Sequence, residues 1–114
     1  MKSIGYVPGK GDVVWLDFDP QAGHEQSGRR PAFVLSPQSY NKKTGLMLCC
    51  PITTQVKSYP FEVAVAGATS AKGVILADQV KSLDWQVRRA EKKGIVTKEV
   101  LEEVILKIRA ILEG

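Results

Sequence analysis

Apolar residues recur with two different periods along this chain, and that change of period constrains the fold more than any other feature. Up to about residue 90, short runs of β-branched, aromatic and aliphatic residues alternate with glycine, proline and polar residues, as in strands joined by turns. Beyond residue 97 the apolar side chains return at i, i+3 and i+4, the spacing of an amphipathic helix. The order predicts a β-rich α+β fold that ends in one helix.

Six runs are predicted as strands: residues 12–18, 31–36, 46–52, 61–66, 73–77 and 83–90. In the first of them Val14, Leu16 and Phe18 share one face, which we expect to be buried. Residues 37–45 are expected to form a polar connection with one helical turn. Five to seven short strands in a chain of 114 residues close most naturally into a small, bent barrel, so we expect one domain over residues 1–114.

The predicted helix carries its apolar side chains on one face and its charges on the other. The apolar positions are Val100, Leu101, Val104, Ile105, Ile108, Ile111 and Leu112. Thr97 is a suitable N-cap, and Glu103 with Lys107 forms an i,i+4 pair of opposite charge.

The charge of the chain is positive and unevenly distributed. The formal net charge is +4, and thirteen basic against eight acidic side chains precede Gly94. A basic body is typical of a polyanion binder, although an ordinary soluble basic surface explains this magnitude equally well. No apolar run approaches the ~18 residues of a membrane span, and the first residues lack the apolar core of a secretion signal. We therefore expect a cytoplasmic protein without a membrane partner.

The two cysteines, Cys49 and Cys50, are adjacent. Neighbouring side chains on a strand point to opposite faces, so these two are poorly placed to bridge each other. His24 is the single histidine, which argues against a zinc site of Cys and His ligands. We expect buried, reduced thiols and neither a metal nor a cofactor.

Residues 19–30 form a long polar connection that contains His24, Glu25, Arg29 and Arg30. Long loops in small domains are usually functional. A carboxylate and a guanidinium this close together can face one phosphate, since arginine binds phosphate oxygens in bidentate fashion. On residue types alone, a surface salt bridge explains such a pair more often than catalysis does.

Ordered stretches over nearly the whole chain resemble the PemK/MazF family of toxin endoribonucleases: residues 11–20, 23–32 with 34–36, 51–55 with 59–63, 73–81 and 92–94. The resemblance implies a small SH3-like barrel of the PemK/MazF/CcdB type and a homodimer. It implies cleavage of single-stranded RNA, such as mRNA, without a metal. The 2′-hydroxyl would attack, leaving a 2′,3′-cyclic phosphate and a 5′-hydroxyl. It also implies a cognate, acidic MazE-like antitoxin.

The same resemblance implies which residues act. The family's functional arginine falls on Arg30, which directly precedes Pro31, its functional threonine on Thr54 and its loop glutamate on Glu25. Six further positions are expected to contact RNA: His24, Gln26, Arg29, Thr53, Gln55 and Lys57. An arginine partner lowers the pKa of a carboxyl and makes it a weaker base. Whether Glu25 takes a proton or only orients Arg30 therefore stays open.

Other interpretations remain. CcdB-like toxins share the barrel by resemblance and poison DNA gyrase without catalysis, and a barrel that binds RNA without cutting it is a third class. Glu25, Arg30 and Thr54 favour the nuclease, because a gyrase binder has no need of this set. Trp15 and Trp85 serve either the core or a dimer interface. The cleavage motif is not readable from the residues, and a site containing ACA follows from family likeness alone.

Overall fold

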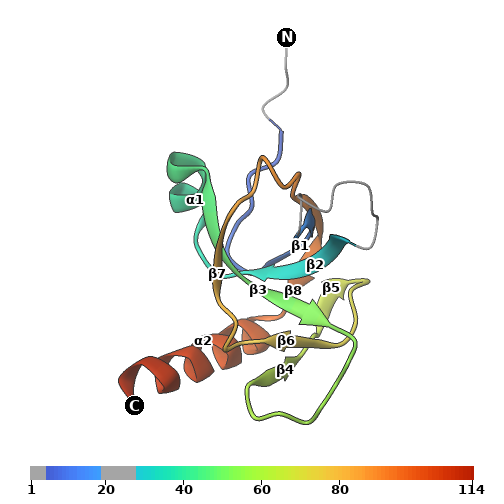
Figure 1. The fold of residues 1–114 in the computed structure, drawn as a ribbon, viewed down its shortest axis with the longest axis vertical. Coiled ribbons are helices and arrows are strands. Elements are labelled where there is room, and N and C mark those ends of the chain that lie inside the picture. Colours follow the sequence, from blue (N-terminus) through green and yellow to red (C-terminus); the bar gives the residue numbers. More distant parts are fainter. Residues whose placement is uncertain (1–4, 19–27) are drawn as a thin grey trace.

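The computed structural model describes residues 5–18 and 28–114, drawn as a ribbon in Figure 1. His24, Glu25 and Gln26, three of the predicted site residues, lie outside these ranges. The elements in chain order are β1 Asp12–Asp17, β2 Arg29–Val34, α1 Gln38–Thr44, β3 Leu46–Thr53, β4 Glu62–Ala64, β5 Gly67–Thr69, β6 Val74–Leu76, β7 Lys81–Asp84, β8 Glu91–Val96 and α2 Lys98–Glu113.

The strands pair antiparallel in the order β4-β6-β3-β2-β1-β8-β5, and β7 adds to the side of β3. The long strand β3 is shared: its residues 46–49 pair with β7, whereas Ile52 and Thr53 pair with β6. Because β3 pairs with β7 along its first half and with β6 at its end, the sheet bends sharply and curls around its core (Figure 1). The predicted SH3-like barrel with a C-terminal helix is confirmed.

The described part of the chain contains eight strands, one more than the upper end of the expected five to seven. The run at residues 61–66 was predicted as one strand, yet β4 ends at Ala64 and the separate strand β5 begins at Gly67. Three-residue strands such as β4, β5 and β6 are too short for an alternating pattern to separate them.

The strand predicted over residues 83–90 is wrong. Strand β7 ends at Asp84, a turn follows, and β8 begins at Glu91. The carboxylate of Asp84 accepts hydrogen bonds from the backbone N–H groups of Gln86 and Val87 at 3.0 and 2.9 Å, which fixes the turn. Trp85 packs into the core and donates its indole N–H to the Asn41 carbonyl at 2.8 Å. Tertiary packing and turn chemistry therefore override the strand pattern.

Two apolar clusters make up the core, one on each side of the sheet. Val14 and Leu16 are fully buried in one cluster, as predicted, with Phe18 packed against it. Val13, assigned to the opposite face, is also fully buried, in the other cluster with Val104 of α2. Because successive side chains of a strand point to opposite faces, β1 contributes to both clusters. Its register against β8 shifts between Val13 and Val14.

Helix α2 begins as predicted. The hydroxyl of Thr97 accepts a hydrogen bond from the Val100 N–H at 3.2 Å, and Lys107 lies 4.0 Å from Glu103. Only the first half packs deeply on the barrel, and Leu112 near the end is 79% exposed. No helix in residues 5–18 and 28–114 is long and apolar enough to cross a membrane.

Helix α1 has seven residues, so it exceeds the single turn that was expected. Its Asn41 is fully buried, and its side-chain amide donates to the carbonyls of Pro8 and Ser36. Cys49 and Cys50 are free and buried, as predicted. Burial raises the pKa of both thiols to about 12.

Candidate functional site

A groove of about 690 Å³ crosses the ends of strands β1, β2 and β3. The connection between β5 and β6 forms its other wall. The groove is lined by Trp15, Arg29, Arg30, Pro31, Ile52, Thr53, Thr54, Gln55, Ser70, Ala71 and Lys72. Five residues predicted from the sequence thus meet at one place, Arg29, Arg30, Thr53, Thr54 and Gln55.

The sheet register explains why Arg30 and Thr54 meet, although 24 positions separate them in the sequence. Strands β2 and β3 run antiparallel with Ala32 opposite Pro51, so the start of β2 and the end of β3 share one rim. Arg30 and Thr54 are both exposed. The hydroxyl of Thr53 accepts a hydrogen bond from the Gln55 N–H at 3.1 Å, which turns the chain away from the strand.

Gly73 allows the backbone of β6 to approach this rim. Its φ of +111° lies in the region that residues with side chains rarely adopt. A Cβ at this position would lie 2.0 Å from the Thr53 carbonyl oxygen and 3.0 Å from the Thr54 Cα. The position of both threonines therefore depends on a residue without a side chain.

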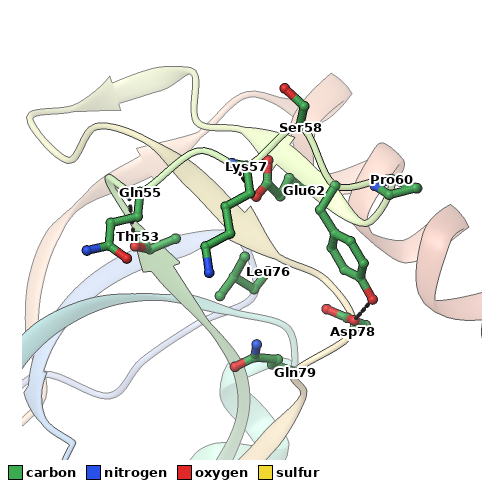
Figure 2. A pocket seen from close by; sticks show the side chains of 10 residues that line it. Thr53, Gln55, Lys57, Ser58, Pro60, Glu62, Leu76, Asp78 and Gln79 are labelled. Atoms are coloured by element: carbon green, nitrogen blue, oxygen red, sulfur yellow. Dashed lines mark hydrogen bonds between the residues drawn. The ribbon is translucent and has the colours of Figure 1, made fainter.

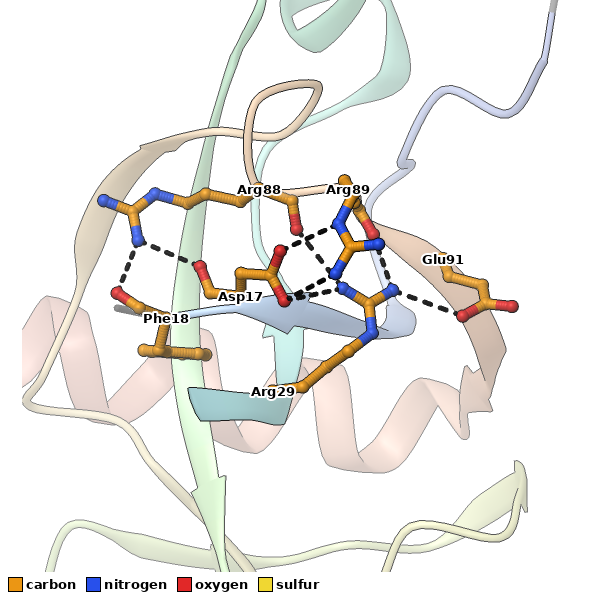
Figure 3. A network of polar contacts seen from close by, with 6 residues as sticks. All are labelled: Asp17, Phe18, Arg29, Arg88, Arg89 and Glu91. Atoms are coloured by element: carbon orange, nitrogen blue, oxygen red, sulfur yellow. Dashed lines mark hydrogen bonds and ion pairs between the residues drawn. The ribbon is translucent and has the colours of Figure 1, made fainter. Parts of the chain in front are cut away.

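Arg29 lines the groove, and its guanidinium is held by acceptors from β1, from the β7–β8 turn and from β8 (Figure 3). It contacts a carboxylate oxygen of Asp17 at 3.0 Å and one of Glu91 at 3.3 Å, and donates to the Arg89 carbonyl at 2.7 Å. Arg89 donates its Nε–H to the second Asp17 oxygen at 2.9 Å. The hydrogen bond from Arg89, with that from Arg29, holds the pKa of Asp17 below its usual value.

The contacts of Arg29 with Asp17, Arg89 and Glu91 were not predicted from the sequence. The pairing of Asp17 with Arg29 is visible once the β1–β2 register is known, because the two are directly opposite. Arg89 approaches from 72 positions away along the chain, and no local pattern predicts that contact.

Lys57 lies at a neighbouring pocket of about 560 Å³, which shares Thr53 and Gln55 with the groove. Its side chain extends into this pocket (Figure 2). In the lining of the same pocket the Tyr59 hydroxyl donates to Asp78 at 2.8 Å, and this hydrogen bond raises the pKa of Tyr59. Tyr59 and Asp78 were not named as site residues, although both stand in stretches that carry the family resemblance.

The groove is suited to a phosphate. Its described lining contains three basic side chains, Arg29, Arg30 and Lys72, together with threonine and serine hydroxyls, and no carboxylate. Guanidinium groups and hydroxyls are common donors to phosphate oxygens. Within residues 5–18 and 28–114, no group of three or more His, Cys, Asp or Glu side chains is arranged to hold a metal ion. Metal independence remains a prediction.

Comparison with known proteins adds independent evidence. Residues 9–112 match the profile of a family described as the PemK-like, MazF-like toxin of type II toxin–antitoxin systems. The chain is 55% identical over 107 residues to the endoribonuclease toxin MazF of Escherichia coli (strain K12), covering 94% of this chain and 96% of that protein.

Solved structures agree. A crystal structure of MazF from Deinococcus radiodurans superposes with a TM-score of 0.85 at 53% identity, covering 96% of this chain and 100% of that one. A MazE–MazF crystal structure from the same organism superposes with a TM-score of 0.84 at 47% identity, covering 95% and 97%. These similarities extend over the whole barrel, including the strands that line the groove.

Proposed function

The chain belongs to the PemK-like, MazF-like family of type II toxins, and from that premise we propose that it is an endoribonuclease toxin that cuts single-stranded RNA in the groove beside Arg30 and Thr54. One observation carries the proposal above all. Arg30 at the start of β2 and Thr54 directly after β3 both line one groove, and its described lining is free of carboxylates. A polyanion with a phosphate at its reacting centre fits such a groove.

The chemistry follows from what RNA supplies itself. The 2′-hydroxyl is the nucleophile, so the protein provides proton transfer and donors for the charge that grows on the phosphate. Arg30 stabilises that charge and donates to the leaving oxygen. Thr54 adds a hydroxyl hydrogen bond. Glu25 either takes the proton or orients Arg30. The products carry a 2′,3′-cyclic phosphate and a 5′-hydroxyl, and no metal takes part.

The remaining predicted residues would hold the RNA on either side of the cut. Lys57 supplies a positive charge in the pocket that adjoins the groove through Thr53 and Gln55. His24 and Gln26 belong to the same proposal on the strength of the family resemblance. Residues 1–114 act as one domain. The RNA cleavage motif is set by how the unpaired bases stack on and hydrogen-bond to the protein.

We further propose an acidic antitoxin as the partner, a homodimer as the active form and the cytoplasm as the location. A MazE–MazF complex is solved for a similar chain, and the basic body of this chain suits an acidic segment. Sedimentation at micromolar concentration tests the dimer, and a purely monomeric species would contradict it.

The activity is tested with pure protein, a long defined single-stranded RNA and excess EDTA. We expect discrete cuts at one repeated motif with 5′-hydroxyl ends, which also identifies the motif. Cleavage that stops in EDTA would contradict metal independence. Intact RNA, with folded protein free of antitoxin, would overturn the nuclease proposal. A gyrase inhibition assay on that sample would then test the CcdB-like alternative.

A further inference from the structure

We propose that Arg29 is a positioning residue: it fastens the first residues of β2 to the β7–β8 turn and thereby fixes Arg30 in the groove. This inference rests on the proposed function of Arg30. It assigns Arg29 to an ion-pair cluster, defined here as Asp17, Arg29, Arg88, Arg89 and Glu91 (Figure 3), instead of to RNA contact.

Arg29 meets four acceptors from three segments of the chain. Its Nη1 lies 3.0 Å from an Asp17 oxygen on β1 and 3.5 Å from the Arg88 carbonyl. Its Nη2 lies 2.7 Å from the Arg89 carbonyl and 3.3 Å from Glu91 on β8. Its side chain is only 25% exposed. A guanidinium held by four acceptors in this way is a rigid connection, not a loosely paired surface charge.

The turn is shaped to receive Arg29. Arg89 adopts a left-handed backbone conformation with φ of +54°, and the carbonyls of Arg88 and Arg89 both accept from Arg29. Arg88 in turn donates to the carbonyls of Asp17 and Phe18, and the Asp17 N–H donates to the Arg88 carbonyl at 2.9 Å. Strand β1 is thus fastened to the turn by its backbone as well as by its carboxylate.

The cluster sits next to Arg30 in the β1–β2 ladder. Asp17 lies opposite Arg29, and the next pair inward is Leu16 opposite Arg30. Between β1 and β2 themselves, only the Phe18–Gly28 hydrogen bond of 2.8 Å lies beyond this pair in the described chain. Strand ends open readily because few contacts hold them. The side chain of Arg30 is exposed, and the backbone at the start of β2 determines where this side chain begins.

The contacts of Arg29 preorganise Arg30, because they hold the start of β2 in place. A group that stabilises charge on the reacting phosphate acts only when it is held within a fraction of an ångström of its working position. A displacement of about 1 Å costs up to ~10²-fold in rate. Loss of the Arg29 connection is therefore expected to lower kcat and to leave KM nearly unchanged.

Direct contact with RNA is the competing role of Arg29. A variant that makes the site more positive separates the two roles, because they predict opposite effects on activity. Asp17→Asn removes a negative charge and releases Arg29. If Arg29 binds RNA, this variant binds RNA more tightly. If Arg29 positions Arg30, Asp17→Asn loses kcat despite the more positive charge. The double variant Arg29→Gln/Asp17→Asn then loses little more than either single variant, since both break one connection.

The experiment measures kcat, KM and backbone hydrogen exchange for the parent, Arg29→Gln, Arg29→Lys and Asp17→Asn. Arg109→Gln is the matched control, because it removes one exposed arginine that pairs only within α2, with Glu113, in the described structure. We expect kcat to fall roughly tenfold to 10²-fold in Arg29→Gln and in Asp17→Asn, with Arg29→Lys between them and the parent. Exchange should accelerate at the amides of residues 15–17 and Arg30, and Arg109→Gln should match the parent.

Three results would overturn the inference: a rise in KM with kcat retained, which indicates RNA contact; unchanged exchange at Arg30; or faster exchange with unchanged kcat. Exchange also separates this inference from the proposed function. If the parent does not cut RNA, the nuclease proposal fails. Accelerated exchange at Arg30 in Arg29→Gln would still support the positioning of that residue, and unchanged exchange would reject it.

Discussion

Asp17 is a half-buried carboxylate between two guanidinium groups, those of Arg29 and Arg89. Their hydrogen bonds and positive charges lower its pKa. A group whose pKa is lower in the folded than in the unfolded chain stabilises the fold above its unfolded pKa of about 3.9. That contribution disappears as the pH falls through the folded pKa.

Asp17→Asn should therefore lower the free energy of unfolding at about pH 6 and have a shrinking effect below about pH 4, where the parent carboxyl also loses its charge. Urea unfolding at several pH values measures this, with Glu113→Gln as a control for an exposed carboxylate on α2. A destabilisation that is constant from pH 6 to pH 2.5 would show that Asp17 acts by packing instead of by charge.

At the scale of elements, the close approach of β6 to the end of β3 sets the shape of the groove. Gly73→Ala places a methyl group 2.0 Å from the Thr53 carbonyl oxygen and also strains a positive φ. Gly45→Ala at the end of α1 has a positive φ as well, but no atom lies within 4 Å of its Cβ. Comparison of the two variants separates the cost of a positive φ, which both share, from the cost of the steric clash, which only Gly73→Ala has.

We expect Gly45→Ala to cost about 1–2 kcal/mol, the usual penalty for a left-handed residue. Gly73→Ala should cost clearly more and should also lower cleavage, because Thr53 and Thr54 must move. Denaturant unfolding and a cleavage assay on both variants test this. Equal stabilities of the two variants, or full activity in Gly73→Ala, would contradict the claim that the close approach of β6 to β3 shapes the groove.

Elements with a strong periodic pattern were predictable from the sequence, and those fixed by turns were not. Helix α2 begins at its predicted N-cap, Thr97, because capping is a local property. The strand expected over residues 83–90 failed, because Asp84 fixes a turn and the core takes up Trp85. The burial of Trp85 favours its core role over an interface role.

At the scale of the whole molecule, the family resemblance alone was enough to assign Arg30, Thr53 and Thr54 to one site. The ion-pair cluster was out of reach of the sequence. It joins Asp17 and Arg29 to Arg89, which lies in the turn before β8. The apolar pattern had predicted a strand over that turn. Long-range contacts that follow from an unpredicted turn cannot be read from local spacing.

The positive charge of the body predicts RNA binding that weakens with salt. If Lys57 contacts one phosphate, Lys57→Gln should reduce the slope of log affinity against log salt by about 0.7. Lys98 on α2, 81% exposed, provides the control variant Lys98→Gln with the same loss of charge. A non-cleavable RNA with a 2′-deoxy residue at the cut site keeps binding separate from cleavage. Equal slopes in both variants would remove Lys57 from the interface.

The central claim is that Arg30 stabilises the reacting phosphate in this groove. Single-turnover cleavage of one defined RNA by the parent, Arg30→Lys and Arg30→Ala tests it most directly. We predict that Arg30→Ala loses ~10²–10³ in rate and that Arg30→Lys recovers part of it, with the fold intact in both. Cleavage by a folded Arg30→Ala at the parent rate would contradict the account.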